Sequence, residues 1–348
     1  MSRRAWARRL VGLGALSALL VACSAPPSAP SSSVRPVPSP PAQSPPAQTL
    51  PSQSTPSPST PSRSAPSPSP VATPPPTPRP PAPPPGVIVL VLENHSYESV
   101  IGSSAAPALN ALASRYGLAT QSFAWGHPSL PNYLDLVGGS SFGIQSDCTG
   151  CSVEATTIAD QLVSNGHTWA AYMEDMPRPC FDGAGAGDYA KKHNPFVYFD
   201  HVRSDPSLCN QDQPFSTFYS ALDAATLPNY SLVVPNQCND GHSCSLAHSD
   251  AWVRDFSNHV IGSAWFRSGG ILLITYDEGA GAAGCCEGAS GGHIATWVVS
   301  AATPPGARLD TPVSHAGLLR TVEILYGLSY LGEAACACSG NLMPLLGR

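Results

Sequence analysis

The sequence has little charge of either sign, and cations are scarce after its first quarter. Asp, Glu, Lys and Arg together make up 11% of the chain. Residues 86–348 carry all 23 acidic residues and all ten histidines against ten lysines and arginines, so their formal charge is −13 with histidine neutral. Nucleic-acid binding usually depends on a basic patch, so nucleic acid is not an expected partner. The negative charge of an anionic substrate would have to be neutralised within the binding site, and a bound metal ion could do this.

The N-terminus lacks an apolar run of membrane-spanning length. Residues 10–22 are apolar, whereas a spanning helix needs about 20 such residues. Four arginines precede this run: Arg3, Arg4, Arg8 and Arg9. A basic segment followed by a short apolar run is typical of an export signal, and we therefore predict that residues 1–22 are a signal peptide.

The predicted signal ends Leu20-Val21-Ala22-Cys23, which resembles the lipobox of bacterial lipoproteins. The resemblance implies that Cys23 is lipidated and tethers the exported protein to a membrane of the cell envelope. An ordinary signal peptide cleaved near Ala22, with an extracellular product, is the alternative.

Acidic residues are absent from the next segment, which is rich in proline. Residues 26–85 hold 25 of the 39 prolines, and their only charges are Arg35, Arg63 and Arg79. Such a composition cannot bury enough apolar surface to offset the entropy of ordering. We predict that residues 23–85 form a disordered stalk, which could extend roughly 190 Å at about 3.1 Å per residue. A low-complexity tail with no spacing role is the alternative.

Cysteine is plentiful, with eleven in the chain and ten of them after Cys23. An even number of cysteines behind an export signal predicts disulfides, here five at most, whose connectivity the sequence does not reveal. Cys148 and Cys151 have the spacing of half a zinc knuckle, but no second pair follows at the spacing of a zinc ribbon. Disulfides are therefore favoured over a zinc site.

Residues 86–348 have the pattern of one α/β domain. Four continuous apolar runs, typical of strands buried on both faces, lie at 86–92, 230–234, 270–276 and 293–300. Helical patterns lie between and after them, at 105–116, 157–165, 250–267 and 314–326. This alternation predicts a doubly wound, mostly parallel sheet with helices on both faces. Ligands of such sheets bind beyond the carboxyl ends of the strands.

Polar residues follow three of the predicted strands. Glu93 and Asn94 follow the first, and Asp277 and Glu278 follow the strand at 270–276. Pro235, Asn236, Asp240 and His242 follow the strand at 230–234. Adjacent carboxylates repel one another, and a divalent cation removes that penalty. Carboxylate and amide oxygens suit a hard cation, so Glu93, Asn94, Asp277 and Glu278 are the predicted metal ligands. Solvated loop acids are the alternative.

Ser129 lies in the segment His127-Pro-Ser-Leu-Pro-Asn-Tyr133, where Pro131 suits the first turn of a helix. Free N–H groups at a helix N-terminus stabilise a phosphoryl group. A serine hydroxyl there becomes a nucleophile when a base or a metal ion activates it. The alternative is that Ser129 is only the N-cap.

Four histidines lie in suggestive contexts: His193, His242, His293 and His315. Four others have no motif around them and are expected to be structural: His167, His201, His248 and His259.

These segments together resemble the bacterial phosphoesterase family, which contains acid phosphatases and phosphatidylcholine-type phospholipases C. That family belongs to the alkaline-phosphatase-like superfamily. The likeness covers residues 86–328, and the order of its motifs is similar to that of secreted acid phosphatases of the mycobacterial type, some of which act on phosphoinositides. The segments that carry the likeness are LENHSYESVIG (92–102), HPSLPNYLDLVGG (127–139), KKHNPFVYF (191–199), VVPNQCNDGHSC (234–244), ITYDEG (274–279), GGH (291–293) and SHAGLLRTVEILYGL (314–328).

The resemblance implies roles for individual residues. Ser129 matches the nucleophile that also touches the metal, and Asn132 matches an asparagine near the phosphate. His193 and His242 match histidines that bind phosphate or protonate the leaving group. The carboxylates and the amide that follow the first strand and the strand at 270–276 match metal ligands. His293 and His315 lie in matching segments without an assigned role.

The sequence departs from the wider superfamily at one position. Asp-His usually ends the strand at 270–276 and completes a second zinc site, whereas Asp277-Glu278 stands here. This difference favours one harder divalent cation. A two-metal site would require that Asp240, His242 and His293 form the second site.

The predicted activity is hydrolysis of a phosphate monoester through a phosphoserine intermediate, at mildly acidic pH if a histidine is the acid. A phosphodiesterase such as a phospholipase C is the nearer alternative. A non-catalytic lipoprotein that binds a surface is the more distant one.

Overall fold

The structure, a computed structural model, describes residues 84–347. The predicted signal peptide, the predicted lipidation site Cys23 and most of the predicted stalk lie outside the described residues. Within residues 84–347, no helix is both long and apolar enough to cross a membrane.

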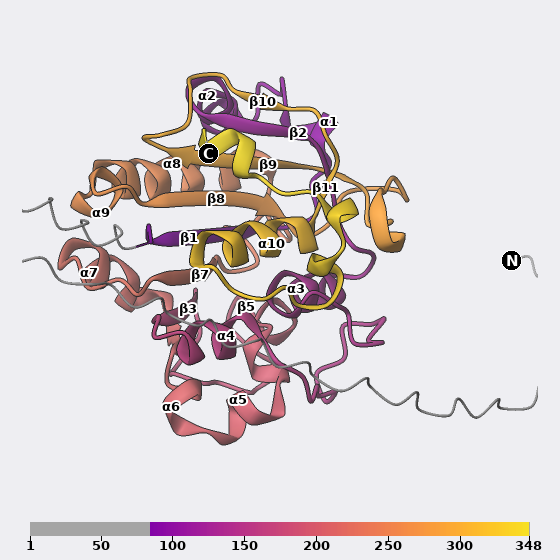
Figure 1. The fold of residues 1–348 in the computed structure, drawn as a ribbon, viewed down its shortest axis with the longest axis vertical. Coiled ribbons are helices and arrows are strands. Elements are labelled where there is room, and N and C mark those ends of the chain that lie inside the picture. The colour runs from indigo at the N-terminus through magenta and orange to yellow at the C-terminus, as the bar shows by residue number, and fades with distance from the viewer. Residues whose placement is uncertain (1–83, 348) are drawn as a thin grey trace, which may run out of the picture. The chain divides into compact units, whose positions relative to one another are not determined.

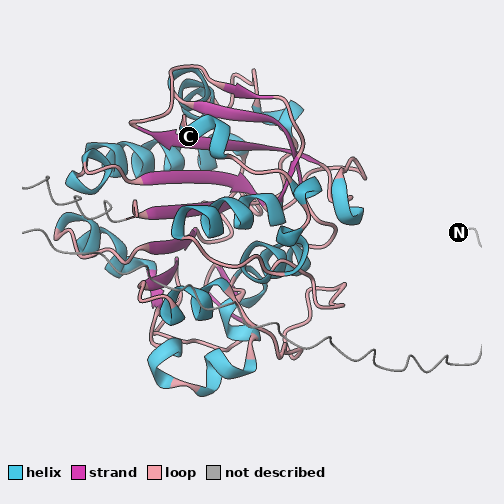
Figure 2. Ribbon diagram, viewed as in Figure 1, coloured by secondary structure: helices cyan, strands magenta, loops and turns pink. Residues whose placement is uncertain are grey.

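A central mixed sheet forms the middle layer (Figures 1 and 2). Its strand order is β10-β2-β9-β8-β1-β7-β3-β6, and β11 also pairs with β2. Only β9 runs antiparallel to its neighbours, β2 and β8, so the prediction of a mostly parallel sheet is confirmed. The strands are β1 (Val87–Leu92), β2 (Gly117–Phe123), β3 (Trp169–Met173), β6 (Asp212–Pro214), β7 (Tyr230–Val234), β8 (Ile271–Tyr276), β9 (His293–Ser300), β10 (Arg308–Leu309) and β11 (Val313–Ser314). A separate hairpin pairs β4 (Gly185–Ala186) with β5 (Tyr189–Ala190).

Helices cover both faces of the sheet, as predicted. Successive side chains of a strand point to opposite faces. In β1, Val87, Val89 and Val91 belong to a core shared with α3 (Ser129–Gly138), α4 (Ile158–Ser164) and α10 (His315–Tyr326). The alternate residues of β1 belong to a second core shared with α2 (Pro107–Arg115), α7 (Phe218–Asp223) and α8 (Leu246–Gly262). The remaining short helices are α1 (Tyr97–Val100), α5 (Asp200–Ser204), α6 (Pro206–Cys209) and α9 (Ala264–Arg267).

The four strands predicted from apolar runs are confirmed as β1, β7, β8 and β9. The single helix predicted at 250–267 is wrong in its bounds, because α8 begins at Leu246 and ends at Gly262. Ser263 then accepts a hydrogen bond from the Phe266 N–H and caps the separate helix α9. The other five strands of the sheet were not predicted. In β2 and β3, alanine, glycine and polar residues interrupt the apolar pattern, and β6, β10 and β11 are only two or three residues long.

The sheet brings the predicted polar residues to one edge. Parallel pairing sets Leu92, the last residue of β1, opposite Tyr276, the last residue of β8. The Asp277 N–H donates to the Leu92 carbonyl at 2.8 Å, and the Glu93 N–H donates to the Asp240 carbonyl at 3.0 Å. The residues that follow β1, β7 and β8 therefore meet at the carboxyl ends of the strands, where this class of sheet binds its ligands.

Candidate active site

Glu93 lies at the centre of this edge and is fully buried. Its Oε1 accepts the Tyr133 hydroxyl at 2.6 Å, and its Oε2 accepts the Asn94 side-chain amide at 2.8 Å. Asn94 adopts a left-handed backbone conformation, with φ of 59°, which turns the chain at the end of β1. Burial, followed by the charges of Asp277 and Asp240, raises the pKa of Glu93 well above its usual range.

Asp277 is also fully buried, and its two oxygens differ. Oδ1 accepts the backbone N–H of Asn94 at 3.0 Å and that of Glu278 at 2.6 Å. Oδ2 is buried without a hydrogen-bond partner within the part of the chain that the structure describes. Burial, and then repulsion by Glu278, raises the pKa of Asp277 to about 7. The buried Oδ2 is therefore an oxygen in need of a proton or a cation.

Ser129 is the first residue of α3, and Pro128 occupies the N-cap position. Its hydroxyl makes no capping bond and lies within donating distance of two carboxylates, 3.2 Å from Glu93 Oε2 and 3.4 Å from Glu278 Oε1. The interpretation of Ser129 as only an N-cap is therefore wrong. Ser129 therefore lies beside three of the four predicted metal ligands, Glu93, Asp277 and Glu278. The fourth, Asn94, is hydrogen-bonded to both Glu93 and Asp277.

Asn132 supports the loop before Ser129. Its Oδ1 accepts the Gly126 N–H at 3.0 Å, and its Nδ2 donates to the carbonyls of Gly126 at 2.8 Å and Pro128 at 3.1 Å. Both amide hydrogens are thus used by the backbone. This geometry favours a role in shaping the loop, and the contact between Asn132 and phosphate stays a prediction.

The two predicted active-site histidines lie beside one another, with ring centroids 5.7 Å apart. His193 is buried, with Nε2 3.2 Å from Glu93 Oε1 and Nδ1 3.3 Å from Asp240 Oδ2. Burial, followed by the charge of Lys192, lowers its pKa well below the usual range. His242 is exposed, and burial of part of its ring lowers its pKa less. His242 is consequently the one that a substrate can reach.

His293 and His315 make contacts elsewhere. His293 Nδ1 lies 2.6 Å from Glu98 Oε1, and its Nε2 lies 2.8 Å from the Thr120 carbonyl. His315 is buried in α10, with Nε2 2.9 Å from the Tyr276 carbonyl, and burial lowers its pKa to about 4. Since both ring nitrogens of His293 have partners outside the site, the structure does not assemble the second metal site that would need it beside Asp240 and His242.

Four residues of the site received no role from the sequence: His127, Tyr133, Asp147 and Lys192. His127 Nδ1 contacts Glu278 Oε2, and its Nε2 lies 2.8 Å from the Gly281 carbonyl. His127 and Tyr133 flank Ser129 in one motif, and Lys192 precedes His193 in another. Their positions in these motifs could have identified all three as site residues. Asp147, which pairs with Lys192 at 3.0 Å, had no such signal.

The buried carboxylates at this edge fit a divalent cation. Glu93, Asp240 and Asp277 are fully buried and Glu278 nearly so. Burial raises the pKa of Asp240 to about 8 as well. Four acids at this spacing cannot all ionise in a dry site without a compensating charge. Their hard oxygen atoms are the ligands that such cations prefer.

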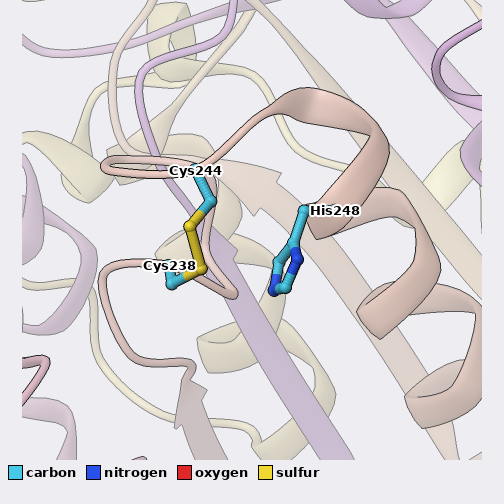
Figure 3. Close-up of side chains that lie close together, drawn as sticks. All are labelled: Cys238, Cys244 and His248. Atoms are coloured by element: carbon cyan, nitrogen blue, oxygen red, sulfur yellow. A yellow bond between two sulfur atoms is a disulfide. The ribbon is translucent and has the colours of Figure 1, made fainter.

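A second cluster with metal-ligand character is formed by Cys238, Cys244 and His248 (Figure 3). The two cysteines form a disulfide, and the His248 ring lies beside it. Because the disulfide engages both sulfur atoms, this cluster is not a metal site in the oxidised protein. The bond instead closes the loop that carries Asp240 and His242 between β7 and α8.

We expect removal of this disulfide to impair both stability and turnover. Closure of so short a loop stabilises a protein by about 2 kcal/mol in the chain-entropy model. Replacing Cys238 and Cys244 with serine should therefore lower the melting temperature by roughly 4–8 °C. Turnover should fall as well, because Asp240 and His242 lose their constraint. Thermal melts and ester hydrolysis test this, with Cys180→Ser/Cys209→Ser as the control that loses stability alone. If the variant that lacks the Cys238–Cys244 disulfide keeps full turnover, this disulfide does not position Asp240 and His242.

Residues 84–347 contain four disulfides, one fewer than the predicted maximum. They join Cys148 to Cys151, Cys180 to Cys209, Cys238 to Cys244 and Cys336 to Cys338. Cys285 and Cys286 form no disulfide, and their side chains contact one another.

The chain is similar in sequence to known phosphatases. The chain is 35% identical to the phosphatidylinositol-3-phosphatase of Mycobacterium tuberculosis over 254 residues, which cover 72% of this chain and 80% of that protein. It is 30% identical to an acid phosphatase of Aspergillus niger over 268 residues, and it spans 61% of that relative's length.

Structural comparison gives the same fold. A protein of the alkaline phosphatase superfamily from Vibrio parahaemolyticus aligns over 75% of this chain with a TM-score of 0.50 and 16% identity. The profile of the Phosphoesterase family matches residues 103–329, which include Ser129, His193, His242 and Asp277. The chain therefore belongs to the phosphoesterase family and is a phosphate-ester hydrolase.

Proposed function

We propose that the protein is a metal-dependent phosphomonoester hydrolase that acts through a phosphoserine intermediate on Ser129. The observation that carries this proposal is the position of the Ser129 hydroxyl, at the N-terminus of α3 and within donating distance of both Glu93 and Glu278. A carboxylate at this distance can take the hydroxyl proton, and the N–H groups of the helix face the phosphoryl group.

The ligands of the proposed cation are Glu93, Asn94, Asp277 and Glu278, together with the Ser129 hydroxyl. When bound, such an ion lowers the pKa of the hydroxyl and offsets the charge of the phosphoryl oxygens. The orphaned Asp277 Oδ2 supports this assignment, because it is a buried acceptor that no described group satisfies.

In the proposed reaction, Ser129 Oγ forms a bond to phosphorus as the bond from phosphorus to the leaving oxygen breaks. The leaving oxygen takes a proton from His242, whose exposed ring lies at the edge of the site. Because burial and then the charge of Lys192 lower the pKa of His242, this transfer requires acidic pH. His193 orients its neighbours, because its two ring nitrogens face Glu93 and Asp240. Water then attacks phosphorus as the bond from phosphorus to Ser129 Oγ breaks. The deprotonated His242 accepts the proton that this water releases, and Ser129 Oγ regains its proton from the carboxylate that had taken it.

The burial of Ser129 favours monoesters. The residue exposes only 1% of its surface, so the reacting group must be narrow. A terminal phosphate presents three unsubstituted oxygens, whereas a phosphodiester carries a second carbon substituent into the same opening. The relative named as a phosphatidylinositol-3-phosphatase supports phosphoinositides as one candidate class of monoester.

A direct comparison of two chromogenic esters tests the proposal. We expect hydrolysis of p-nitrophenyl phosphate at mildly acidic pH, with kcat/KM at least about tenfold above that for bis-p-nitrophenyl phosphate, a barrier difference of about 1.4 kcal/mol. Faster hydrolysis of the diester would establish the phosphodiesterase alternative. Activity that survives exhaustive chelation would reject the metal.

We further propose that the enzyme is exported and tethered through Cys23. The sequence Leu20-Val21-Ala22-Cys23 and the proline-rich residues after it motivate this proposal. The four disulfides of residues 84–347 support export, because disulfides persist mainly in oxidising compartments.

A further inference from the structure

Lys192 places a cation beside a group of carboxylates. Its Nζ lies 3.0 Å from Asp147 Oδ2 and 3.3 Å from His242 Nε2, and its side chain is 19% exposed. The chain has only two lysines, Lys191 and Lys192. Lys191 is committed elsewhere, since it is buried, pairs with Asp182 and donates to the Thr149 carbonyl at 2.7 Å. Lys192 is therefore the lysine that an incoming anion can meet.

Asp147 links Lys192 to helix α3. Asp147 uses one oxygen for Lys192 and the other for the Leu130 N–H, at 3.0 Å, in the first turn of α3. The disulfide between Cys148 and Cys151 closes the segment immediately after Asp147. This arrangement ties the ammonium group to the N-terminus of the helix that carries Ser129.

Lys192 lies beside the site, because its Nζ is 3.3 Å from Nε2 of His242. Burial alone would lower its pKa, but the bond to Asp147 and the charges of Asp147, Glu93 and Asp277 raise it above the usual range. The group is thus positively charged at all working pH values. A phosphate dianion that approaches four carboxylates needs positive charge besides the metal, and a partly desolvated lysine supplies it at little cost in reorganisation.

We propose that Lys192 binds a non-reacting oxygen of the substrate's phosphate group and that Asp147 is the residue that positions it. This inference rests on the proposed function and adds a residue pair to the same site. The alternative is an ordinary ion pair between Lys192 and Asp147, which would contribute about 0–1 kcal/mol to stability and nothing to phosphate binding.

Calorimetric titration of the purified protein with inorganic phosphate tests the proposal without depending on turnover. Lys192→Gln is expected to weaken phosphate binding about 10- to 100-fold, the range for loss of a hydrogen bond to a charged group. Lys192→Arg keeps the charge and should recover much of the affinity. Asp147→Asn keeps Lys192 but removes the ion pair that positions it, and should weaken phosphate binding at least about threefold. Arg254→Gln removes an exposed cation of α8 and serves as the control for net charge.

Steady-state kinetics give a second measurement. If Lys192 binds phosphate in both the ground state and the transition state, Lys192→Gln raises KM for p-nitrophenyl phosphate more than it lowers kcat. The inference is wrong if Lys192→Gln and Asp147→Asn both bind inorganic phosphate as tightly as the parent, or if the parent does not bind it. Failure of the parent to hydrolyse any phosphate ester would instead reject the proposed function, so the two failures are distinguishable.

Discussion

Replacement of Ser129 with alanine is expected to lower turnover by about 10³-fold or more while the fold survives. Loss of the nucleophile removes the covalent step, and its cost in comparable enzymes is several orders of magnitude. The stability cost should be small, because Pro128, not Ser129, occupies the N-cap and the Ser129 hydroxyl makes no capping bond. We expect the melting temperature to change by less than about 2 °C. Thermal melts and p-nitrophenyl phosphate hydrolysis measure the two effects.

Ser263→Ala is the matched control, because Ser263 is a true N-cap, of α9, with no contact to the site residues. Its loss should cost about 1 kcal/mol of stability and leave turnover unchanged. The two serine variants thus separate capping from catalysis. If Ser129→Ala retains more than about a tenth of wild-type turnover, the barrier has changed by less than about 1.4 kcal/mol and Ser129 is not the nucleophile.

The sequence predicted the fold well where the physical signal was local. Continuous apolar runs identified β1, β7, β8 and β9, since strands buried on both faces need apolar side chains at every position. Strand β3 (WAAYM) escaped because its alanines give no strong β-branched signal, although the whole strand is buried. Helix α8 was misplaced because the Ser245 cap sets its start at Leu246 and the Ser263 cap begins a separate helix where a single one was predicted.

The candidate site was predictable to the extent that strand ends and motifs determined it. Glu93 and Asp277 meet because parallel pairing aligns the ends of β1 and β8, which a sheet topology implies in advance. The pair formed by Asp147 and Lys192 joins residues 45 positions apart through a loop whose path no periodicity reveals. Conversely, His293 looked functional beside two glycines, but both of its ring nitrogens have partners away from the site.

Replacement of Asp277 with asparagine is expected to abolish turnover and to have opposite effects on the stability of the metal-bound and metal-free proteins. With metal, the variant loses an anionic ligand and should melt at a lower temperature. Without metal, Asp277 is a fully buried acid whose neighbour Glu278 repels its charge. An asparagine of the same shape removes that repulsion, and its Oδ1 can still accept the N–H groups of Asn94 and Glu278.

Melting curves with excess metal and after chelation, together with elemental analysis of the purified proteins, measure these effects. Asp135→Asn is the matched control, since Asp135 is equally buried in α3 but lies outside the group of proposed ligands. It should leave metal content unchanged. When the free metal concentration is about 100 times the Kd of the wild type, metal binding adds about 2.7 kcal/mol to the free energy of unfolding. This should raise the melting temperature of the wild type by roughly 5–11 °C. If chelation lowers the melting temperature of wild type and Asp277→Asn equally, Asp277 does not bind the metal. If chelation changes neither melting temperature, no metal is bound and the buried carboxylates must be neutralised by protons instead.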